Sequence, residues 1–498
     1  MSDERAEQHH DLSRRRFLAG AGATALAAAA VAPAGAAAAA PRARIGNRRN
    51  GVDICVVGAG LTGLTAARAL QAAGHSVHVM ESDDRVGGRI WTAEAADGTP
   101  LNLGATFIGP GQDKIAALAR ELGVATYATY NTGDNVLFFD GKRSTYTGTV
   151  PPLDPASLVE AVTLIARLDQ MATTIDPAKP WAAANADEWD GQTFETWKLA
   201  NAVTAGARKL LDLAVNALFS VESRDVSLLY VLFYIRSAGS LNRLVDTAGG
   251  AQERQFTGGS QQIPEALAQR LGKGSVSLSE PVRTIRTLPG GGVLVVGDKR
   301  TVAAKRVLVA VPPTMVPRIV FEPGLAARKD QVRQRLPFGS IGKSIAVYDR
   351  PFWRDAGLTG QATSDQGPMN ATFDISPASG RPGVMMGFID GQDARDFSTL
   401  SAAARRDLCL RQFATYFGPQ ALAPREYRDV LWDELPLHRG CPVAVPGPGV
   451  LTGYTSALLE PEGPIHFAST EAATVWAGYM DGAIQAGTTA AAAIAAEL

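Results

Sequence analysis

The sequence has few of the side chains that build disulfide frameworks or metal sites. Its 498 residues include six histidines and three cysteines, Cys55, Cys409 and Cys441. The cysteines are far apart and the histidines show no metal-ligand spacing. We therefore expect neither a disulfide-stabilised domain nor a bound metal ion.

The chain also lacks an excess of charge of either sign. Its 48 lysines and arginines oppose 49 aspartates and glutamates, which leaves a formal net charge of -1. Proteins that bind nucleic acid usually carry a strongly basic surface, so we expect no nucleic-acid partner. With 46% hydrophobic and 19% charged residues, the composition is that of a globular protein, and the length suits two domains.

The longest stretch without charge near the N-terminus predicts an export signal. Ser13-Arg14-Arg15-Arg16-Phe17-Leu18 matches the twin-arginine pattern, and an Ala/Gly-rich stretch continues to about Ala40. The alternative is a membrane anchor, but alanine and glycine are only weakly apolar, which favours a signal (1–40) cleaved near Ala32-Pro33-Ala34. The mature protein would then be periplasmic or extracellular, without a stable membrane span, and residues 41–51 would form a linker.

The strongest motif predicts a nucleotide-binding βαβ unit in residues 53–89. The pattern indicates a buried parallel strand at Ile54–Val57, a helix at Leu64–Ala73 and a second strand at Val77–Met80. The turn glycines allow a tight bend, close approach of a pyrophosphate and close packing of the helix. A carboxylate at the tip of the second strand can bind the ribose hydroxyls of an adenosine. The predicted cradle comprises Gly58, Ala59, Gly60, Gly63 and Glu81.

A second pair of glycines narrows the choice of cofactor. The segment Arg85-Val86-Gly87-Gly88-Arg89 would place further N–H groups, including that of Gly88, and the Arg89 cation beside the diphosphate. An enzyme that binds only NAD has no need of this pair. The whole stretch resembles the extended FAD signature of the flavin monoamine oxidase family.

The resemblance extends from about Asp53 to Leu498. It is carried also by LPFGSIGKSIAVYDRPFWR (336–354), HRGCP (438–442) and WAGYMDGA (476–483). It implies an α/β fold of two domains, a Rossmann-like FAD domain and an α+β substrate domain with a mixed sheet and helices. The FAD domain would comprise residues 52–135, 256–322 and 436–498. The substrate domain would comprise a helical part, 136–255, and a sheet part, 323–435.

The resemblance implies two catalytic positions. Lys343 precedes a predicted strand, Ser344–Tyr348, where a lysine is usually solvated. In the family, however, a lysine at this position holds a water near flavin N5 and assists the reaction with oxygen. Tyr479 matches one of two aromatic rings that hold the amine against the flavin.

Further FAD contacts are also implied by the resemblance. Cys441 falls where the family's cysteine bonds to the flavin 8α-methyl carbon, although a small buried filler is the alternative. Trp432, on a strand predicted at Val430–Asp433, would lie near the flavin, and Val282 near the adenine. The remaining implied contacts are Gly104, Ala105, Thr106 and Glu471.

The implied substrate pocket departs from the family. Its predicted members are Gln252, Phe388, Pro442 and Trp476, and a surface position is the alternative for Gln252. In the family, two aromatic rings enclose the substrate amine. Pro442 stands where the second ring is expected, so Tyr479 supplies the only predicted ring. Ser469 replaces a glycine usual before the Thr-Glu pair, and Ala371 replaces a bulkier pocket residue in a loose alignment.

The resulting functional prediction is FAD-dependent oxidation of a small amine to an imine, which water hydrolyses, with O2 reduced to H2O2. One alternative is an amine dehydrogenase of the same fold that uses a cytochrome or quinone. Another is an L-amino-acid oxidase, for which Arg236 or Arg243 would have to bind a carboxylate. A non-catalytic flavin-binding protein is the remaining alternative. The sequence does not determine whether the protein forms a homodimer.

Overall fold

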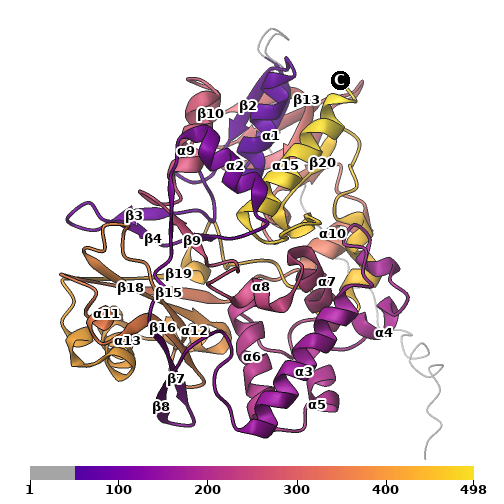
Figure 1. Ribbon diagram of the computed structural model, residues 1–498. Coiled ribbons are helices and arrows are strands. Elements are labelled where there is room, and N and C mark those ends of the chain that lie inside the picture. Colours follow the sequence, from indigo (N-terminus) through magenta and orange to yellow (C-terminus); the bar gives the residue numbers. More distant parts are fainter. Residues whose placement is uncertain (1–50) are drawn as a thin grey trace, which may run out of the picture. The chain divides into compact units, whose positions relative to one another are not determined.

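The computed structural model describes residues 51–498 (Figure 1). The predicted export signal and almost all of the predicted linker lie outside the described residues. The division of residues 52–498 into an FAD domain and a substrate domain stays a prediction. In both large sheets, strands that are distant in sequence pair with one another.

The first sheet is built around the predicted βαβ unit. Strands β1 and β2 run parallel, and β13 and β20 extend the parallel core on the other side of β1. The strand order is β10-β2-β1-β13-β12-β11-β14, with β20 also paired to β13. Its strands are β1 (Val52–Val57), β2 (Val77–Met80), β10 (Val276–Ser277), β11 (Val282–Thr287), β12 (Val293–Gly297), β13 (Thr301–Val309), β14 (Val320–Glu322) and β20 (Ile465–Phe467).

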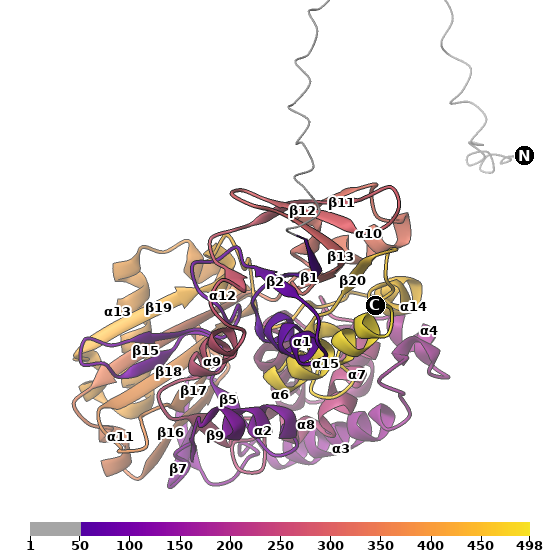
Figure 2. The same ribbon diagram turned by 90° about the horizontal axis from the view of Figure 1, so that it is seen from above.

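Helices α1 (Leu61–Ala72) and α15 (Met480–Ala495) lie side by side on one face of this sheet (Figures 1 and 2). A Cβ on Gly487 would lie 2.4 Å from the carbonyl oxygen of Thr62, so only glycine permits this close helix packing. The opposite face buries a valine-rich cluster that includes Val282, Val309 and Phe467. Helix α15 thus packs on α1, the first helix of the described residues.

A second sheet, β19-β15-β18-β17-β16-β7-β8, lies at the lower left in Figure 1. Most of its strands are antiparallel, and β7 and β8 form a hairpin around Asp140-Gly141, a pair that favours such a turn. The turn residues Asp140 and Gly141 have φ of 50° and 74°, as a two-residue hairpin turn requires. Its strands are β7 (Asp134–Phe139), β8 (Lys142–Tyr146), β15 (Ile341–Tyr348), β16 (Leu358–Ser364), β17 (Met369–Asp374), β18 (Gly383–Asp390) and β19 (Glu426–Leu431).

A block of helices, which lies within the predicted helical part 136–255, forms beside this sheet (Figure 1). The side chains of Asp154 and Thr204 cap α3 and α6 by accepting backbone N–H bonds, which stabilises helix starts. Helix α7 is apolar on all sides and almost completely buried, as expected for a central helix. The block consists of α3 (Pro155–Ala172), α4 (Ala186–Asp190), α5 (Phe194–Asn201), α6 (Ala205–Phe219), α7 (Leu228–Ala238) and α8 (Leu241–Val245).

Shorter elements complete the described chain. Two small sheets pair β3 with β4 and order β5-β9-β6. The strands are β3 (Thr92–Glu94), β4 (Pro100–Asn102), β5 (Phe107–Ile108), β6 (Thr126–Ala128) and β9 (Arg254–Phe256). The further helices are α2 (Asp113–Leu122), α9 (Gln262–Arg270), α10 (Ala327–Gln334), α11 (Phe352–Asp355), α12 (Gly391–Ser398), α13 (Ala402–Phe417) and α14 (Val450–Tyr454).

Several predicted boundaries are wrong. Helix α1 begins at Leu61 rather than at Leu64, so Gly63 lies in its first turn. The pattern of residues 223–234 also predicts a helix, but helix α7 starts only at Leu228, because the carbonyl oxygens of Ser223 and Val226 accept hydrogen bonds from N–H groups of α5. The strand predicted at Val430–Asp433 ends at Leu431, and Trp432 begins a 3-10 turn.

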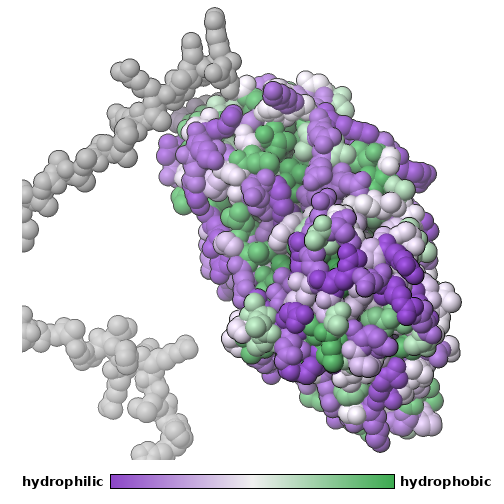
Figure 3. Space-filling model, turned by 90° about the vertical axis from the view of Figure 1, so that its left-hand side faces the viewer, coloured by the Kyte–Doolittle hydropathy of each residue, from purple (hydrophilic) through white to green (hydrophobic). Residues whose placement is uncertain are grey.

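The visible face of the described chain carries hydrophilic residues with hydrophobic ones between them (Figure 3). Within residues 51–498, no helix combines the length and apolar character needed to cross a bilayer. The same residues contain no cluster of His, Cys, Asp and Glu side chains that could hold a metal ion.

Candidate active site

The turn between β1 and α1 has the geometry of a phosphate cradle. Gly58 has a φ of +102°, and a Cβ on Gly63 would lie 2.0 Å from the carbonyl oxygen of Gly58. In contrast, a Cβ on Gly60 would meet nothing within 4 Å. Gly58 and Gly63 therefore serve the turn itself, whereas Gly60 faces open space into which a diphosphate fits.

Glu81 at the end of β2 closes one side of this cradle. Its carboxylate accepts the N–H of Ala59 at 2.5 Å and that of Asp83 at 2.8 Å. Burial raises the pKa of Glu81, and these hydrogen bonds oppose the rise. The carbonyl of Glu81 accepts the N–H of Glu280 at 2.7 Å, which brings Val282, the first residue of β11, to the same edge. The ribose and adenine positions predicted from sequence thus lie together.

Arg89 ties the second glycine pair to the distant end of the chain. Its guanidinium contacts the buried Glu471 carboxylate through Nη1 at 2.6 Å and Nη2 at 3.3 Å. The same Nη1 donates to the carbonyl of Pro442 at 2.7 Å. Near them, Gly88 has a φ of +58° and its carbonyl accepts a hydrogen bond from Arg85. Four predicted positions are therefore one connected group.

The loop Gly104-Ala105-Thr106 binds the backbone beside Arg89. Gly104 N–H donates to the carbonyl of Trp91 and Ala105 N–H to that of Arg89, both at 3.0 Å. A Cβ on Gly104 would lie 2.2 Å from the Arg89 carbonyl oxygen, so only glycine allows this approach. The loop is thereby held against the second glycine pair.

Lys343 reaches this loop from the second sheet. It lies within β15, not before it, and is 4% exposed, so the solvated alternative is wrong. Its Nζ donates to the Gly104 carbonyl at 2.5 Å and to Thr106 Oγ1 at 2.8 Å. Burial lowers the pKa of Lys343 to about 7. A buried amine with a pKa near neutrality suits a catalytic site.

Cys441 lies near Lys343 and the Arg89 group. Its N–H donates to the carbonyl of Gly339 at 3.2 Å, and its side chain packs against the hydrophobic cluster that contains Val430 and Trp432. Burial raises the pKa of the Cys441 thiol to about 12, although the charges of Arg89 and Lys343 act in the opposite direction. All three cysteines are free.

Trp432 is fixed by the same loop. Its indole N–H donates to the Leu103 carbonyl at 3.1 Å, and its ring meets Trp91 edge-on at 6.2 Å. His438 packs on the other side of it, with the ring centroids 5.1 Å apart. Trp432 therefore supports the backbone that carries Gly104, in a position consistent with its predicted place near the flavin.

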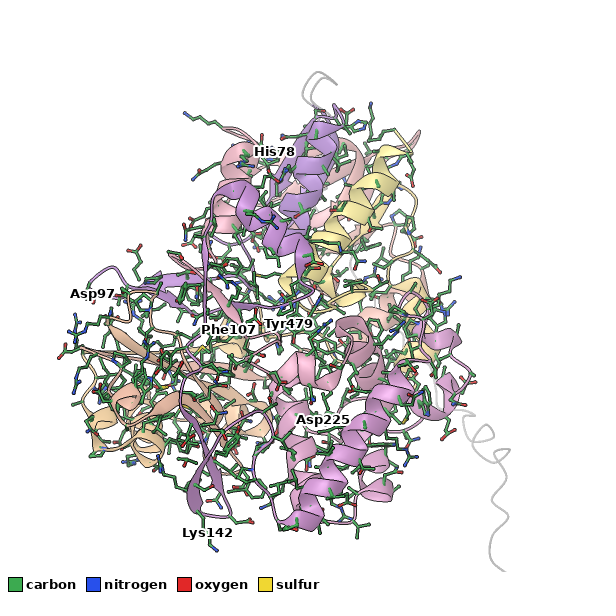
Figure 4. The ribbon with its side chains drawn as sticks, in the orientation of Figure 1. His78, Asp97, Phe107, Lys142, Asp225 and Tyr479 are labelled. Carbon is green, nitrogen blue, oxygen red and sulfur yellow. The ribbon has the colours of Figure 1, made fainter. Side chains whose placement is uncertain are left out.

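Tyr479 belongs to an aromatic cluster. Its ring centroid lies 4.9 Å from that of Trp476 and 6.0 Å from that of Tyr234. Figure 4 shows Tyr479 and Phe107 in the central part of the described chain, between the first sheet and the elements below it. Burial raises the pKa of the Tyr479 hydroxyl, so this ring is a neutral apolar wall.

The predicted pocket residues differ in their surroundings. Phe388 pairs with Lys343 across β15 and β18, and its ring lies 5.1 Å from Nζ. Gln252 is partly buried, and its amide donates to the Leu244 carbonyl at 3.1 Å while Oε1 is buried without a partner. The surface alternative for Gln252 is therefore wrong. Pro442 contributes its carbonyl to Arg89, as described above.

Two further residues of this region are not among the positions predicted from the sequence. Tyr234 joins the Tyr479 ring to Phe219, 4.7 Å away. Gln112 precedes α2, and both polar atoms of its buried amide lack a partner. Gln112 follows the glycine-rich segment 104–111, and a polar residue at that place could have been recognised as a candidate site residue. Tyr234 lies in a helix that is apolar almost throughout, so its sequence context did not distinguish it.

The site combines a dinucleotide cradle with a buried lysine and an aromatic wall, which defines a flavin-dependent oxidoreductase. The comparisons with known proteins narrow this class. Residues 61–495 match the family model described as flavin containing amine oxidoreductase. The chain belongs to this family of flavin-containing amine oxidases and oxidises amines with FAD.

Relatives match over nearly their whole length. The protein AofH of Mycobacterium tuberculosis, whose name places it among flavin-containing monoamine oxidases, is 42% identical over 447 residues, or 90% of this chain and 97% of AofH. Human flavin-containing amine oxidase B is 34% identical over 446 residues, 89% of this chain and 86% of the human protein.

Solved structures show the same fold. Putrescine oxidase bound to putrescine superimposes with a TM-score of 0.86 at 34% identity, covering 89% of this chain and 99% of the other. Cyclohexylamine oxidase from Brevibacterium oxydans has a TM-score of 0.86 at 32% identity, covering 90% and 99%. The open space at Gly60 and the carboxylate of Glu81 fit the cofactor of this family, FAD, whose diphosphate and ribose they would hold.

Proposed function

We propose that this enzyme oxidises a small, largely apolar monoamine and passes the electrons to dioxygen. The aromatic wall of Tyr479, Trp476 and Tyr234 supports an apolar substituent beside the reacting carbon. We expect the amine to react in its neutral form, because a buried ammonium without a paired carboxylate is costly. The product imine would be hydrolysed to a carbonyl compound and ammonia or a smaller amine.

The buried Lys343 is the observation that carries the choice of oxygen as acceptor. When bound, FAD supplies the two-electron chemistry. Lys343 would hold a water through its Nζ, which the Gly104 carbonyl and Thr106 hydroxyl fix in place. A preorganised donor of this kind stabilises negative charge that develops on oxygen as it is reduced to hydrogen peroxide.

Cys441 would fix the flavin covalently. The thiol lies in the neighbourhood of Lys343 and Arg89, and the Pro442 carbonyl anchors its loop to Arg89. A thioether to the flavin methyl group would keep the cofactor in place during export. Transport of a folded, cofactor-loaded protein is what the twin-arginine pattern at Ser13–Leu18 predicts.

A panel of amines assayed for hydrogen peroxide tests the proposal. Small arylalkyl and cycloalkyl amines should bleach the flavin anaerobically, and air should restore the colour with one peroxide formed per amine oxidised. Bleaching that only a cytochrome or quinone reverses would instead show an amine dehydrogenase. Preference for L-amino acids would show an amino-acid oxidase, although Arg236 and Arg243 both lie exposed.

A further inference from the structure

Arg333 is a buried cation away from the active site. It lies on α10, is 3% exposed and stacks over the ring of Phe467, with 4.0 Å between its guanidinium carbon and the ring centroid. Its terminal nitrogens donate to the carbonyls of Lys329 and, at 3.1 Å, Leu458. The Nε atom is buried and lacks a partner among the described residues. The guanidinium thus keeps unused donors.

No carboxylate of residues 51–498 forms an ion pair with Arg333. Asp330 accepts a hydrogen bond from Gln334 at 2.6 Å, and Glu462 pairs with Lys329 at 2.8 Å. Burial lowers the pKa of Arg333 to about 10. Buried charges in proteins are normally paired, and this one has only more distant negative neighbours.

Arg333 is one of the residues that line a cavity of about 240 Å³ beside α10 and β14. Val316, Ile319, Phe321 and Leu325 supply an apolar lining, and Asp330 is the one acidic side chain in it. An engineered cavity of ~150 Å³ is large enough for benzene. The space near Arg333 therefore admits a molecule with one ring and one polar group.

We propose that this cavity binds a small monocarboxylate with an apolar body of about one ring. The carboxylate would use the free donors of Arg333, since guanidinium and carboxylate match geometrically. The body would pack on Val316, Ile319 and Phe321. A single negative charge is favoured because Asp330 would repel a second one. The site lies on the sheet face that buries Phe467, opposite α1 and α15.

Benzoate binding to the flavin-loaded enzyme, measured by calorimetry, tests this site. Wild type should bind benzoate and should bind the neutral isostere benzamide at least tenfold more weakly. R333M should weaken benzoate binding at least tenfold. The matched control is R335M, which removes an exposed arginine two residues away that stacks on Tyr454, and it should bind benzoate like wild type.

Three results would overturn the proposal. They are no benzoate binding by wild type at millimolar concentration, equal binding by R333M, and displacement of benzoate by an amine substrate, which would place it in the active site. D330N gives an independent arm should R333M fail to fold. Removal of this negative charge should tighten benzoate binding several-fold, and unchanged or weaker binding by D330N would contradict the assignment.

Discussion

Lys343 is a buried amine whose pKa is set by its surroundings. Its ammonium loses its water shell but gains acceptors at Asn102, Gly104 and Thr106, which all lie within five consecutive residues. The balance leaves its pKa at about 7, so protonated and neutral forms coexist at neutral pH. The residue can therefore hold a charge and release a proton under working conditions.

Replacing Lys343 by methionine should slow the reaction of reduced enzyme with oxygen by about 10²-fold, because a preorganised positive donor is lost. Anaerobic reduction by amine should change by only a few-fold. Stopped-flow measurement of the two half-reactions separates these effects. K142M, at an exposed strand position, is the control, and unchanged oxygen kinetics in K343M would refute the assigned role.

The pH dependence of the oxygen reaction should follow Lys343. Because burial lowers the pKa from its usual 10.5 to about 7, the charged form predominates only below that pH. The bimolecular rate constant for oxygen should therefore fall as pH rises from about 6 to 8, since the cation attracts developing negative charge. In K343M the same profile should lack this step; a step that persists would assign it to another group.

Cys441 offers a simple chemical test. Acid precipitation of the wild-type enzyme should leave a yellow pellet if the proposed thioether exists, and C441A should give a colourless pellet with flavin in the supernatant. C409A, which alters a cysteine buried in the core of the second sheet, should stay yellow. A colourless wild-type pellet would exclude the covalent bond without affecting the FAD assignment.

At the scale of elements, one side chain joins two helices. Asp481 in the first turn of α15 is fully buried and accepts the N–H groups of Lys114 and Ile115 at 2.7 and 3.0 Å. It thus caps α2 from outside that helix. This contact links the closing motif of the chain to the helix that follows the glycine-rich loop.

D481A should lower the free energy of unfolding by about 2–3 kcal/mol, because two buried N–H groups lose their acceptor. D481N retains one acceptor oxygen and should cost less. Denaturant unfolding of both variants, with D113N at an exposed site as control, measures the difference. Stability of D481A within ~0.5 kcal/mol of wild type would show that water replaces the cap.

Helices and strands with a local pattern could be predicted from the sequence. The burial and hydrogen bonds of side chains whose partners are distant in sequence could not. Strand β2 has the predicted bounds, and helix α6 covers the stretch 205–219 whose apolar residues recur at helical spacing, because both patterns are local. The burial of Lys343 depends on acceptors 237 to 241 residues earlier. Most of the cofactor positions came from the family resemblance, which encodes such contacts. Arg333 carried no local signal at all.

At the scale of the whole molecule, export is a separate prediction. Replacing Arg14 and Arg15 by lysine should retain the full-length protein in the cytoplasm, because the twin-arginine pair is what the export machinery reads. R16K, outside the pair, should still be exported. Fractionation with a peroxide assay on each fraction measures the outcome, and export of the double variant would disprove this route.

The contact between Arg89 and Glu471 spans 382 residues. Strand β20 joins the first sheet, and α15 packs on α1, from the last part of the chain. During synthesis the cradle at Gly58–Gly63 therefore emerges early but stays incomplete until residues 465–495 have been made. We therefore expect that a chain lacking these residues would not retain the flavin, so that cofactor insertion would distinguish finished molecules from truncated ones.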